Sequence, residues 1–223
     1  DINHAGFKTG DEYLLHENAY SDKPLVFLDQ LGFVYNLDST KISISRGQGE
    51  PLSKYFQIQD GVSVVGMHLL TKKLSILTMT NYGYGFICLY EDLIVKNKKG
   101  KTLLRTKDSL AVKSISVDLD TDLYYLIITD AGYMLVSKIK NVPILSKGRG
   151  VKLINIPKSS EESIVFTSVL RKGESLSFSY DSNRKRVMDF NILKGFIMER
   201  NRRGKKIDKK FLLEKVKTTY NIE

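Results

Sequence analysis

A short basic segment, residues 144–156, combines residue types that together suit phosphate groups. Its sequence is I-L-S-K-G-R-G-V-K-L-I-N-I, in which Lys147, Arg149 and Lys152 alternate with two glycines. Glycine permits backbone turns that other residues resist, and the β-branched run that follows is typical of a strand. Cations beside the exposed N–H groups of such a turn attract phosphate oxygens. The segment therefore predicts a tight basic turn, mounted on the end of a strand, that binds phosphate.

Three further segments carry degenerate copies of this turn. They read S-R-G-Q-G-E-P-L at 45–52, N-K-K-G-K-T-L-L at 97–104 and E-R-N-R-R-G-K-K at 199–206. Any one of them is as consistent with a solvated turn that carries incidental cations as with a turn that binds phosphate. Four turns at equivalent places in a repeat favour a common role, because equivalent positions of a blade array lie along one rim. A curved row of cations predicts contacts that follow a nucleic-acid backbone without reading its bases.

Charge is distributed unevenly along the 223 residues. Residues 1–95 carry a net charge of −4 and residues 96–223 a net charge of +14, which together give the overall +10. A basic field confined to part of a protein indicates a polyanionic partner, with nucleic acid ahead of an anionic membrane surface. No apolar run approaches the ~20 residues of a membrane-spanning helix. The first residues lack the basic and apolar regions of a secretory signal.

Catalytic motifs are incomplete in this sequence. The G-K-T at 100–102 resembles the end of a P-loop, but Val95 stands where the first glycine of that loop belongs. No Ser-His-Asp or Cys-His arrangement is recognisable, so no catalytic residue is predicted. Direct reading of bases is not indicated either. Tyrosines such as Tyr82, Tyr84 and Tyr125 lie in strand runs, where we expect them to pack in the core.

Metal-binding motifs are incomplete as well. Three aspartates within residues 118–122 have the spacing of a calcium loop, but Leu123 replaces the required glycine. A hairpin tip between Val117 and Leu123 is predicted instead. The three histidines lie far apart in sequence, so no metal site is predicted. The single cysteine, Cys88, is expected to be a small buried side chain, and the absence of an internal disulfide fits a reducing cytoplasm.

An internal repeat of about 50 residues organises the chain. Gly32, Gly83 and Gly132 are 51 and 49 residues apart, and each follows an apolar run and opens a tight turn. A basic glycine turn follows each of them after 17 or 18 residues. Strand runs separated by turns, with little helical periodicity, are typical of all-β proteins. About four strands in each repeat are typical of propeller blades.

The repeat predicts a single all-β domain over residues 1–223, with four full blades and one partial blade. A more degenerate fourth unit begins with the apolar run 176–180. Residues 1–24 resemble the tail of a further unit, so the chain is expected to start inside a larger protein. The successive blades are predicted at about 25–73, 74–122, 123–173 and 174–223.

Five segments form a specific combination in this order. They are V-F-L-D at 26–29, S-R-G-Q-G-E-P-L at 45–52, Y-G-Y-G-F at 82–86, A-G-Y-M-L at 131–135 and L-S-K-G-R-G-V-K-L-I-N-I-P at 145–157. This combination resembles the C-terminal domain of the A subunit of bacterial DNA topoisomerase IV, and the similarity extends from Asp1 to about Lys210. The resemblance implies a β-pinwheel, a propeller-like disc of about five four-stranded blades that exchange strands with their neighbours. The disc is either closed or broken.

The resemblance also implies a non-catalytic domain that binds and bends duplex DNA on its basic rim. Such a domain steers a DNA segment toward the strand-passage core of the parent enzyme for decatenation and supercoil relaxation. In the family the cleaving tyrosine of that core follows an arginine, and this chain has no Arg-Tyr pair. The DNA contacts implied in the matching turns are Arg46, Lys98, Lys99, Lys101, Lys147, Arg149, Lys152, Arg202, Arg203 and Lys205.

The same resemblance implies the partners and the setting of the domain. The parent would be an ATP-dependent type IIA topoisomerase of bacteria, in which the rest of the A subunit joins the ATPase B subunit in a heterotetramer. ATP and Mg²⁺ act through other domains, so no cofactor is expected here. In some relatives this domain also docks on a chromosome-condensing protein of the SMC type. The implied location is the cytoplasm at the nucleoid, with the inner face of the cell membrane as an alternative.

Two alternatives stay open at this point. The C-terminal domain of the gyrase A subunit has the same fold and wraps DNA through a Q-R-R-G-G-K-G box, of which residues 202–205 are a partial echo in a different blade. The position of the box itself lies upstream of Asp1. The sequence R-G-Q-G-E-P and the run that ends L-I-N-I-P favour topoisomerase IV. A propeller-type scaffold whose basic rim docks an acidic partner protein is the alternative from another functional class.

Overall fold

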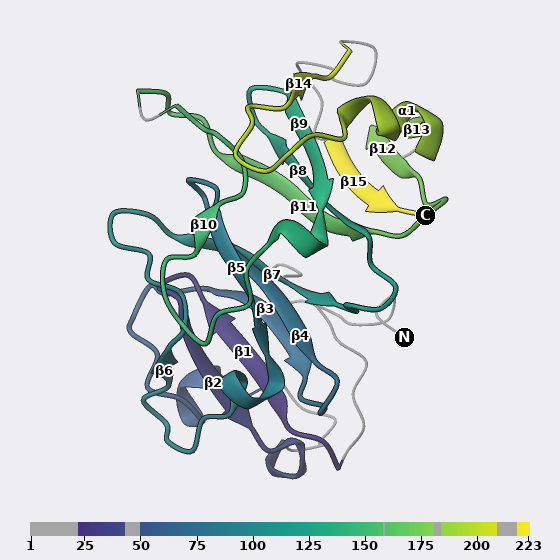
Figure 1. Cartoon of the computed structure of the whole chain (residues 1–223). Coiled ribbons are helices and arrows are strands. Elements are labelled where there is room, and N and C mark those ends of the chain that lie inside the picture. The colour runs from purple at the N-terminus through teal and green to yellow at the C-terminus, as the bar shows by residue number, and fades with distance from the viewer. Residues whose placement is uncertain (1–21, 43–49, 158, 181–183, 209–217) are drawn as a thin grey trace.

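The chain folds into four antiparallel β-sheets that follow one another along the sequence (Figure 1). The computed structural model describes residues 22–42, 50–157, 159–180, 184–208 and 218–223. The first sheet has the strand order β3 (Val64–Leu69), β1 (Leu25–Asp29), β2 (Phe33–Leu37) and β6 (Lys101–Thr102). The second has the order β7 (Ala111–Val117), β4 (Ser75–Thr80), β5 (Tyr84–Leu89) and β10 (Val151–Lys152).

The third and fourth sheets repeat this plan. The third has the order β11 (Ile164–Leu170), β8 (Tyr124–Thr129), β9 (Tyr133–Lys138) and β14 (Lys205–Lys206), and the fourth has β15 (Thr218–Ile222), β12 (Leu176–Tyr180) and β13 (Arg184–Met188). Helical structure is confined to short turns in the described residues. These are η2 (Ser39–Lys41), η3 (Leu52–Lys54), η4 (Tyr90–Leu93), η5 (Ile139–Asn141), α1 (Phe190–Leu193) and η7 (Lys194–Phe196). The predicted all-β class is confirmed.

Each of the first three sheets is built around a hairpin whose turn contains a glycine. In the second sheet the N–H of Gly83 donates to the carbonyl oxygen of Thr80 across 2.9 Å, and the φ of Gly83 is 77°. Side chains make this left-handed conformation unfavourable, and a Cβ on Gly83 would also lie 2.7 Å from Ile154. Gly32 and Gly132 close the first and third hairpins with the same hydrogen bond. The glycines that define the sequence repeat are therefore the residues that close the hairpins.

The outermost strand of each complete sheet comes from the following repeat. β6 lies after the second hairpin in sequence, yet it pairs with β2 of the first sheet, where Phe33 faces Thr102. In the same way β10 pairs with β5 of the second sheet, and β14 pairs with β9 of the third. Strand exchange between neighbouring sheets, as the family resemblance implies, is therefore present. We call β6, β10 and β14 the exchanged strands.

Three hydrophobic cores lie between consecutive sheets and anchor the exchanged strands. The core between the second and third sheets contains Leu77 and Tyr125, together with Leu153 and Ile154, the two residues that follow β10. The Tyr125 hydroxyl donates to the carbonyl oxygen of Leu153 across 3.0 Å. Full burial of a leucine or isoleucine side chain contributes about 1.5–3 kcal/mol to stability. Each two-residue exchanged strand is thus held by the apolar residues behind it rather than by its few backbone hydrogen bonds.

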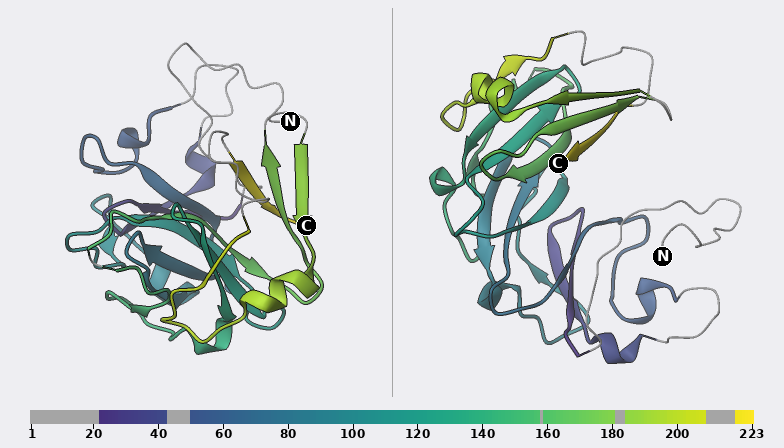
Figure 2. Two further views of the ribbon diagram at one scale, coloured as in Figure 1. Left: turned by 90° about the horizontal axis from the view of Figure 1, so that it is seen from above. Right: turned by 90° about the vertical axis from the view of Figure 1, so that its right-hand side faces the viewer.

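The four sheets follow an arc that does not close into a ring (Figure 2). Among the described residues no strand pairing joins the first sheet to the fourth. The fourth sheet has three strands in the described part of the chain. There β13 pairs with β12 on one side, and no exchanged strand pairs with its other side. The β-pinwheel class is confirmed, in an open form. Residues 1–21 of the predicted partial blade lie outside the described residues.

The aspartate-rich segment after β7 forms a turn, but not the predicted hairpin tip. The N–H of Asp122 donates to the carbonyl oxygen of Asp118, and the N–H of Asp118 donates to the carboxylate of Asp122, both across 2.8 Å. The buried carboxylate of Asp122 also lies 3.0 Å from Nε of Arg171. The strands on either side, β7 and β8, belong to different sheets. The prediction was wrong because local turn signals do not specify which strands pair.

Candidate nucleic-acid interface

The exchanged strand β10 and the turn before it hold two predicted cations beside one aromatic ring. The guanidinium carbon of Arg149 lies 3.8 Å from the centroid of the Tyr84 ring, and Nζ of Lys152 lies 6.0 Å from it. Lys152 also donates to Oδ1 of Asn155 across 2.7 Å. An aromatic face fixes the plane of a guanidinium group and leaves the N–H groups at its edge available to an anion. The guanidinium group of Arg149 is therefore held in a fixed plane on the Tyr84 ring.

The exchanged strand β14 repeats this arrangement on the third sheet. The guanidinium carbon of Arg203 lies 4.0 Å from the centroid of the Tyr133 ring, and Nζ of Lys206 lies 4.9 Å from it. Arg203 differs from Arg149 because its Nη1 also lies 2.5 Å from Oε2 of Glu162, whose side chain is 3% exposed. The charge of Arg203 is thus balanced by a buried carboxylate, whereas Arg149 has no ion pair within the described residues.

The exchanged strand β6 carries lysines at the corresponding places on the first sheet. Lys98 and Lys99 are exposed in the turn before the strand, and Lys101 lies within it. The carbonyl oxygen of Lys98 accepts a hydrogen bond from the N–H of Gln57 across 2.8 Å, which fixes this turn. Phe33 follows the hairpin glycine directly, at the position that tyrosines occupy in the second and third sheets. Three consecutive sheets therefore carry cations on their outermost strand.

The turn before each exchanged strand depends on its glycine. Gly150 has a φ of 76°, and a Cβ there would lie 2.1 Å from the carbonyl oxygen of Gly85. Gly204 has a φ of 85°, and a Cβ there would lie 2.5 Å from the carbonyl oxygen of Met134. No side chain fits between the turn and the neighbouring strand at these distances. The glycine in each basic turn therefore allows the cations to lie directly against the preceding sheet.

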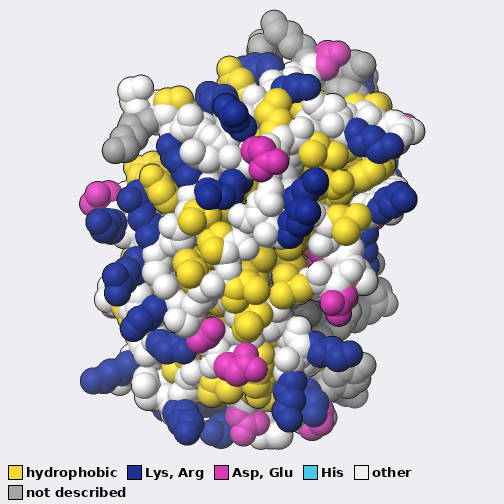
Figure 3. All heavy atoms as spheres, in the orientation of Figure 1, with side chains coloured by type: hydrophobic (Ala, Val, Ile, Leu, Met, Phe, Trp, Pro, Cys, Tyr) yellow, Lys and Arg dark blue, Asp and Glu magenta, His cyan; other side chains and the backbone are white. Residues whose placement is uncertain are grey.

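The exchanged strands lie in a row along one edge of the molecule, which we call the basic edge. In Figure 1 β14, β10 and β6 follow one another from the top of the view down its left side, and Figure 3 shows lysine and arginine side chains along that side. Among the ten predicted contacts, Arg46 lies outside the described residues. The exposed ones are Lys98, Lys99, Lys147, Arg149, Arg202 and Lys205, and the half-buried ones are Lys101, Lys152 and Arg203.

Sequence reasoning missed the tyrosines of the basic edge. Assignment of Tyr125 to the core is correct, because it is fully buried. The same assignment is wrong for Tyr82, which is 43% exposed, and incomplete for Tyr84, which is half-buried beneath Arg149. A signal was present in the sequence, because an aromatic residue directly follows the first glycine of each of the three clear repeats. Its meaning depends on strand exchange, which brings the arginine of the next repeat onto that ring.

Features of other site classes are sparse. In the part of the chain that the structure describes, no group of three or more His, Cys, Asp or Glu side chains is placed to hold a metal ion. No helix among the described residues is long and apolar enough to cross a membrane. Cys88 is buried as predicted, and burial raises the pKa of its thiol to about 12. Cys88 is therefore a packing residue rather than a nucleophile.

Comparisons with known proteins agree with the geometry. Residues 123–171 match a family model described as the DNA gyrase C-terminal domain, beta-propeller. The A subunit of DNA topoisomerase 4 from Haemophilus influenzae is 34% identical over 89% of this chain. The solved structure of the E. coli ParC C-terminal domain is 30% identical, with a TM-score of 0.78 over 91% of this chain and 82% of that one. This chain belongs to the family of C-terminal domains of the topoisomerase IV A subunit.

The topoisomerase IV resemblance found in the sequence is thereby confirmed. This C-terminal domain spans 27% of the length of the Haemophilus influenzae and Escherichia coli subunits. The solved DNA gyrase A C-terminal domain has a TM-score of 0.71 at 15% identity, and it covers 91% of this chain and 66% of its own. That likeness shows a shared fold alone.

Proposed function

We propose that this topoisomerase IV C-terminal domain binds duplex DNA along the basic edge. The observation that carries the proposal is the repeated placement of cations at the exchanged strands, with Arg149 held on Tyr84 and Arg203 on Tyr133. A row of fixed cations neutralises successive phosphates and releases the counterions bound to them, which favours association. Contacts of this kind position a duplex without reading its sequence.

The arc of the sheets implies that the bound duplex is bent. A duplex that follows the basic edge across curved sheets must bend, and a bend of 40–90° over 20–30 base pairs costs about 1–6 kcal/mol. Several phosphate contacts offset a cost of this size. We infer that the domain steers a bent DNA segment toward the strand-passage core of its parent protein, for decatenation and supercoil relaxation. In this role the domain itself is non-catalytic.

The proposed role also defines the partners. The curated relatives are named as the A subunit of DNA topoisomerase 4. We infer that the rest of the A subunit, together with an ATPase B subunit, completes the enzyme, and that ATP and Mg²⁺ act there rather than in this domain. An SMC-type condensing protein is a further proposed partner in the bacterial cytoplasm.

Fluorescence anisotropy with a random-sequence duplex tests the proposed function. We expect binding at about 50 mM salt that weakens by orders of magnitude at about 200 mM, as phosphate contacts require. Duplexes of unrelated sequence are expected to bind equally well. Absence of binding at the lowest salt concentration would contradict the proposed function and would not affect the family assignment.

Removal of the aromatic support beneath Arg149 is expected to weaken binding moderately. Tyr84→Ala frees the guanidinium group, and a cation–π contact at a partly exposed site is worth about 1 kcal/mol, or about fivefold in affinity. Tyr84→Phe keeps the ring and is expected to bind as the wild type does. Anisotropy titrations of both variants measure the effect. Equal affinities of the alanine and phenylalanine variants would contradict the role of the ring.

Loss of the carboxylate that balances Arg203 is expected to strengthen DNA binding. Glu162→Gln leaves the Arg203 charge free for a phosphate, so we expect about one additional contact and a slope of log K against log[salt] that is steeper by about 0.9. Glu161→Gln is the matched control, because it removes the same charge from the exposed neighbouring residue. Identical salt slopes in the two variants would show that the buried ion pair does not restrain Arg203.

A second candidate function, docking of a protein partner, is favoured by an apolar groove beside η5. The groove has a volume of about 480 Å³, and its lining includes Leu119, Leu123 and Ile144. The side chains of these residues are 43%, 43% and 51% exposed, respectively. A partner bound there is expected to stay bound when DNA saturates the basic edge and to dissociate when Ile144 is replaced by aspartate. Displacement of that partner by DNA would place its contact on the basic edge instead.

A further inference from the structure

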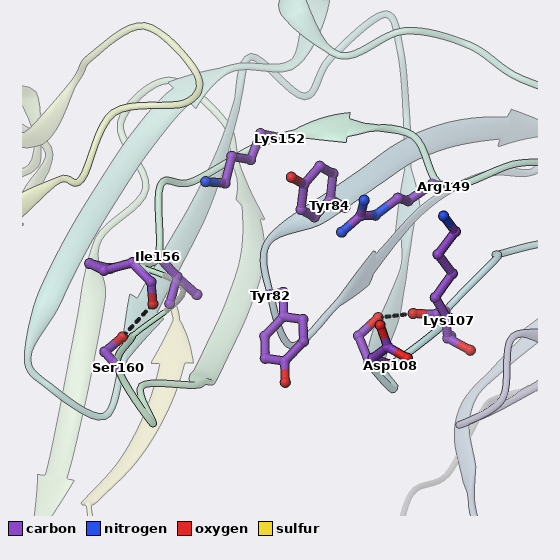
Figure 4. A pocket seen from close by; sticks show the side chains of 11 residues that line it. Tyr82, Tyr84, Lys107, Asp108, Arg149, Lys152, Ile156 and Ser160 are labelled. Carbon is purple, nitrogen blue, oxygen red and sulfur yellow. Dashed lines mark hydrogen bonds between the residues drawn. The ribbon is translucent and has the colours of Figure 1, made fainter.

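A recess of about 420 Å³ opens on the basic edge beside the hairpin turn of the second sheet (Figure 4). Its lining combines aromatic faces, cations and hydroxyl groups from four separate segments. These residues are Tyr82, Tyr84, Thr106, Lys107, Asp108, Ser109, Arg149, Lys152, Ile156, Pro157 and Ser160. A flat hydrophobic surface next to fixed cations suits a ligand that has both a ring and an anion.

Tyr82 presents an exposed ring on a rigid backbone. The turn around it is closed by the hydrogen bond from Gly83 to Thr80. The neighbouring Asn81 donates its N–H to the carbonyl oxygen of Leu110 across 2.9 Å and accepts from the N–H of Leu110 through Oδ1 across 3.0 Å. Tyr82 nevertheless is 43% exposed, and among the described residues its side chain has no hydrogen bond or ring contact.

The hairpin itself does not need an aromatic residue at this position. Leu31 precedes the hairpin glycine in the first sheet and Ala131 does so in the third, and both turns have the same closing hydrogen bond. An aliphatic or a small side chain therefore supports the same backbone. The ring of Tyr82 contributes little to the turn, and a ligand that covers it would explain its presence.

Cations surround the recess on two sides. Arg149 and Lys152 approach from the β10 side, and Figure 4 shows Lys107 beside Arg149 on the opposite side of Tyr82 from Lys152. Lys107 has a φ of 50° and is one of two non-glycine residues with a left-handed backbone in the described part of the chain. Such a conformation is unfavourable for residues with a Cβ and is often found at functional sites. Asp108 is the one carboxylate among the residues that line the recess.

We propose that this recess receives one unstacked nucleotide of the bound DNA, with its base on the Tyr82 ring and its phosphate on Arg149 and Lys152. The inference rests on the proposed function, since it requires DNA along the basic edge. The volume suits one small ligand. Both faces of a base inside a duplex are covered by its stacked neighbours, so only an unstacked base can lie on the Tyr82 ring. Every base has a π face, so stacking on tyrosine is independent of sequence. On this proposal the basic edge binds intact duplex through its phosphates. It binds duplex that contains an unpaired nucleotide more tightly, because that nucleotide also occupies the recess.

Two matched DNA substrates test this inference by fluorescence anisotropy. One duplex carries a single bulged thymidine, and the other carries a bulged abasic site at the same position, so both are flexible but one alone has a base to stack. The wild-type chain is expected to bind the thymidine bulge about tenfold more tightly. Tyr82→Ala is expected to lose this preference and to keep its affinity for the abasic duplex. Tyr82→Phe is expected to retain the preference, because its ring still stacks.

Leu31→Ala, the corresponding change in the first hairpin turn, is the matched control and is expected to keep the full preference. Tyr82→Ala is expected to fold, since alanine occupies the same position in the third sheet, and its thermal unfolding curve checks this. A wild-type chain that binds both bulges equally would overturn the inference, and so would a preference that survives Tyr82→Ala. Failure to bind either duplex at low salt would overturn the proposed function itself, which is a distinguishable result.

Discussion

Replacement of Lys147, Arg149 and Lys152 by alanine is expected to weaken binding of a random-sequence duplex by about 100-fold at ~100 mM salt. These three cations belong to β10 and the turn before it, in the middle of the row of exchanged strands. The slope of log K against log[salt] is negative, and each lost phosphate contact makes it less steep by about 0.9, so the triple variant is expected to have a slope less steep by about 2.7. Anisotropy titrations at several salt concentrations measure both quantities.

The triple variant is expected to remain folded. Lys147 and Arg149 are exposed and Lys152 is half-buried, so none of the three belongs to a core. The residues that anchor β10, Leu153 and Ile154, stay in place between the second and third sheets. Thermal unfolding midpoints within a few degrees of the wild type would separate loss of DNA contacts from loss of structure.

A second triple variant, with Lys72, Lys73 and Lys172 replaced by alanine, provides the matched control. These exposed lysines follow β3 and β11, at the ends of the sheets opposite the hairpin turns, and the change in net charge is the same. We expect less than about a threefold change in affinity, because charges away from the contact act through a screened field. Equal losses in the two triple variants would show that net charge, rather than the basic edge, determines binding.

Acidification from pH 7 to pH 4 is expected to lower the free energy of unfolding by about 3 kcal/mol through His68. The residue is 5% exposed, and its Nε2 and Nδ1 lie 2.7 Å and 2.9 Å from the hydroxyl oxygens of Ser114 and Ser116. His68 lies on β3 and the serines on β7, so the ring joins the innermost strands of the first and second sheets. Burial disfavours the charged ring and lowers the pKa of His68 to about 4.

The direction of this effect follows from the two pKa values. In the unfolded chain His68 titrates near its ordinary pKa of about 6.5. Between pH 6.5 and 4 the unfolded state therefore binds more protons than the folded state, and lowering the pH favours unfolding. The contribution of His68 is fully present above pH 6.5 and is lost as the pH falls toward 4. Below that value both states are protonated, and no further loss is expected from this residue.

Urea unfolding of the wild type and of His68→Gln at several pH values measures the effect. Glutamine can still hydrogen-bond the serines but does not titrate, and His4 and His16 are present in both proteins, so their contributions cancel. The difference in unfolding free energy between the two proteins is expected to shift by about 3 kcal/mol between pH 7 and pH 4, against the wild type. Parallel pH profiles would contradict a buried neutral histidine between the sheets.

The hairpins and the basic turns were predictable because their constraints are local. A left-handed backbone at Gly83 or Gly150 favours glycine wherever the turn occurs, so the requirement appears directly in the sequence. The same locality explains the error in the segment after Val117. Aspartates with turn spacing predicted the turn correctly, but the partner strands of β7 and β8 lie elsewhere in the chain.

The chemistry of individual cations was not predictable in this way. Arg149 and Arg203 both precede a turn glycine, and the sequence treats them alike. The difference between them comes from Glu162, which lies far from Arg203 in sequence and is buried against it by the packing of the third sheet. Whether the charge of an arginine is available to a ligand therefore depends on a non-local contact.

The sequence by itself determined the all-β class, the repeat and the positions of the basic turns, because these follow from residue types over a few positions. The tertiary structure alone decided that the strand after Gly150 joins the preceding sheet, and so that Arg149 lies on Tyr84. It also decided that Tyr82, in the hairpin turn before β5, is exposed beside a recess, while Tyr125, within β8, is buried. The physical reason is that pairing and burial depend on residues brought together from different repeats, which no short stretch of sequence contains.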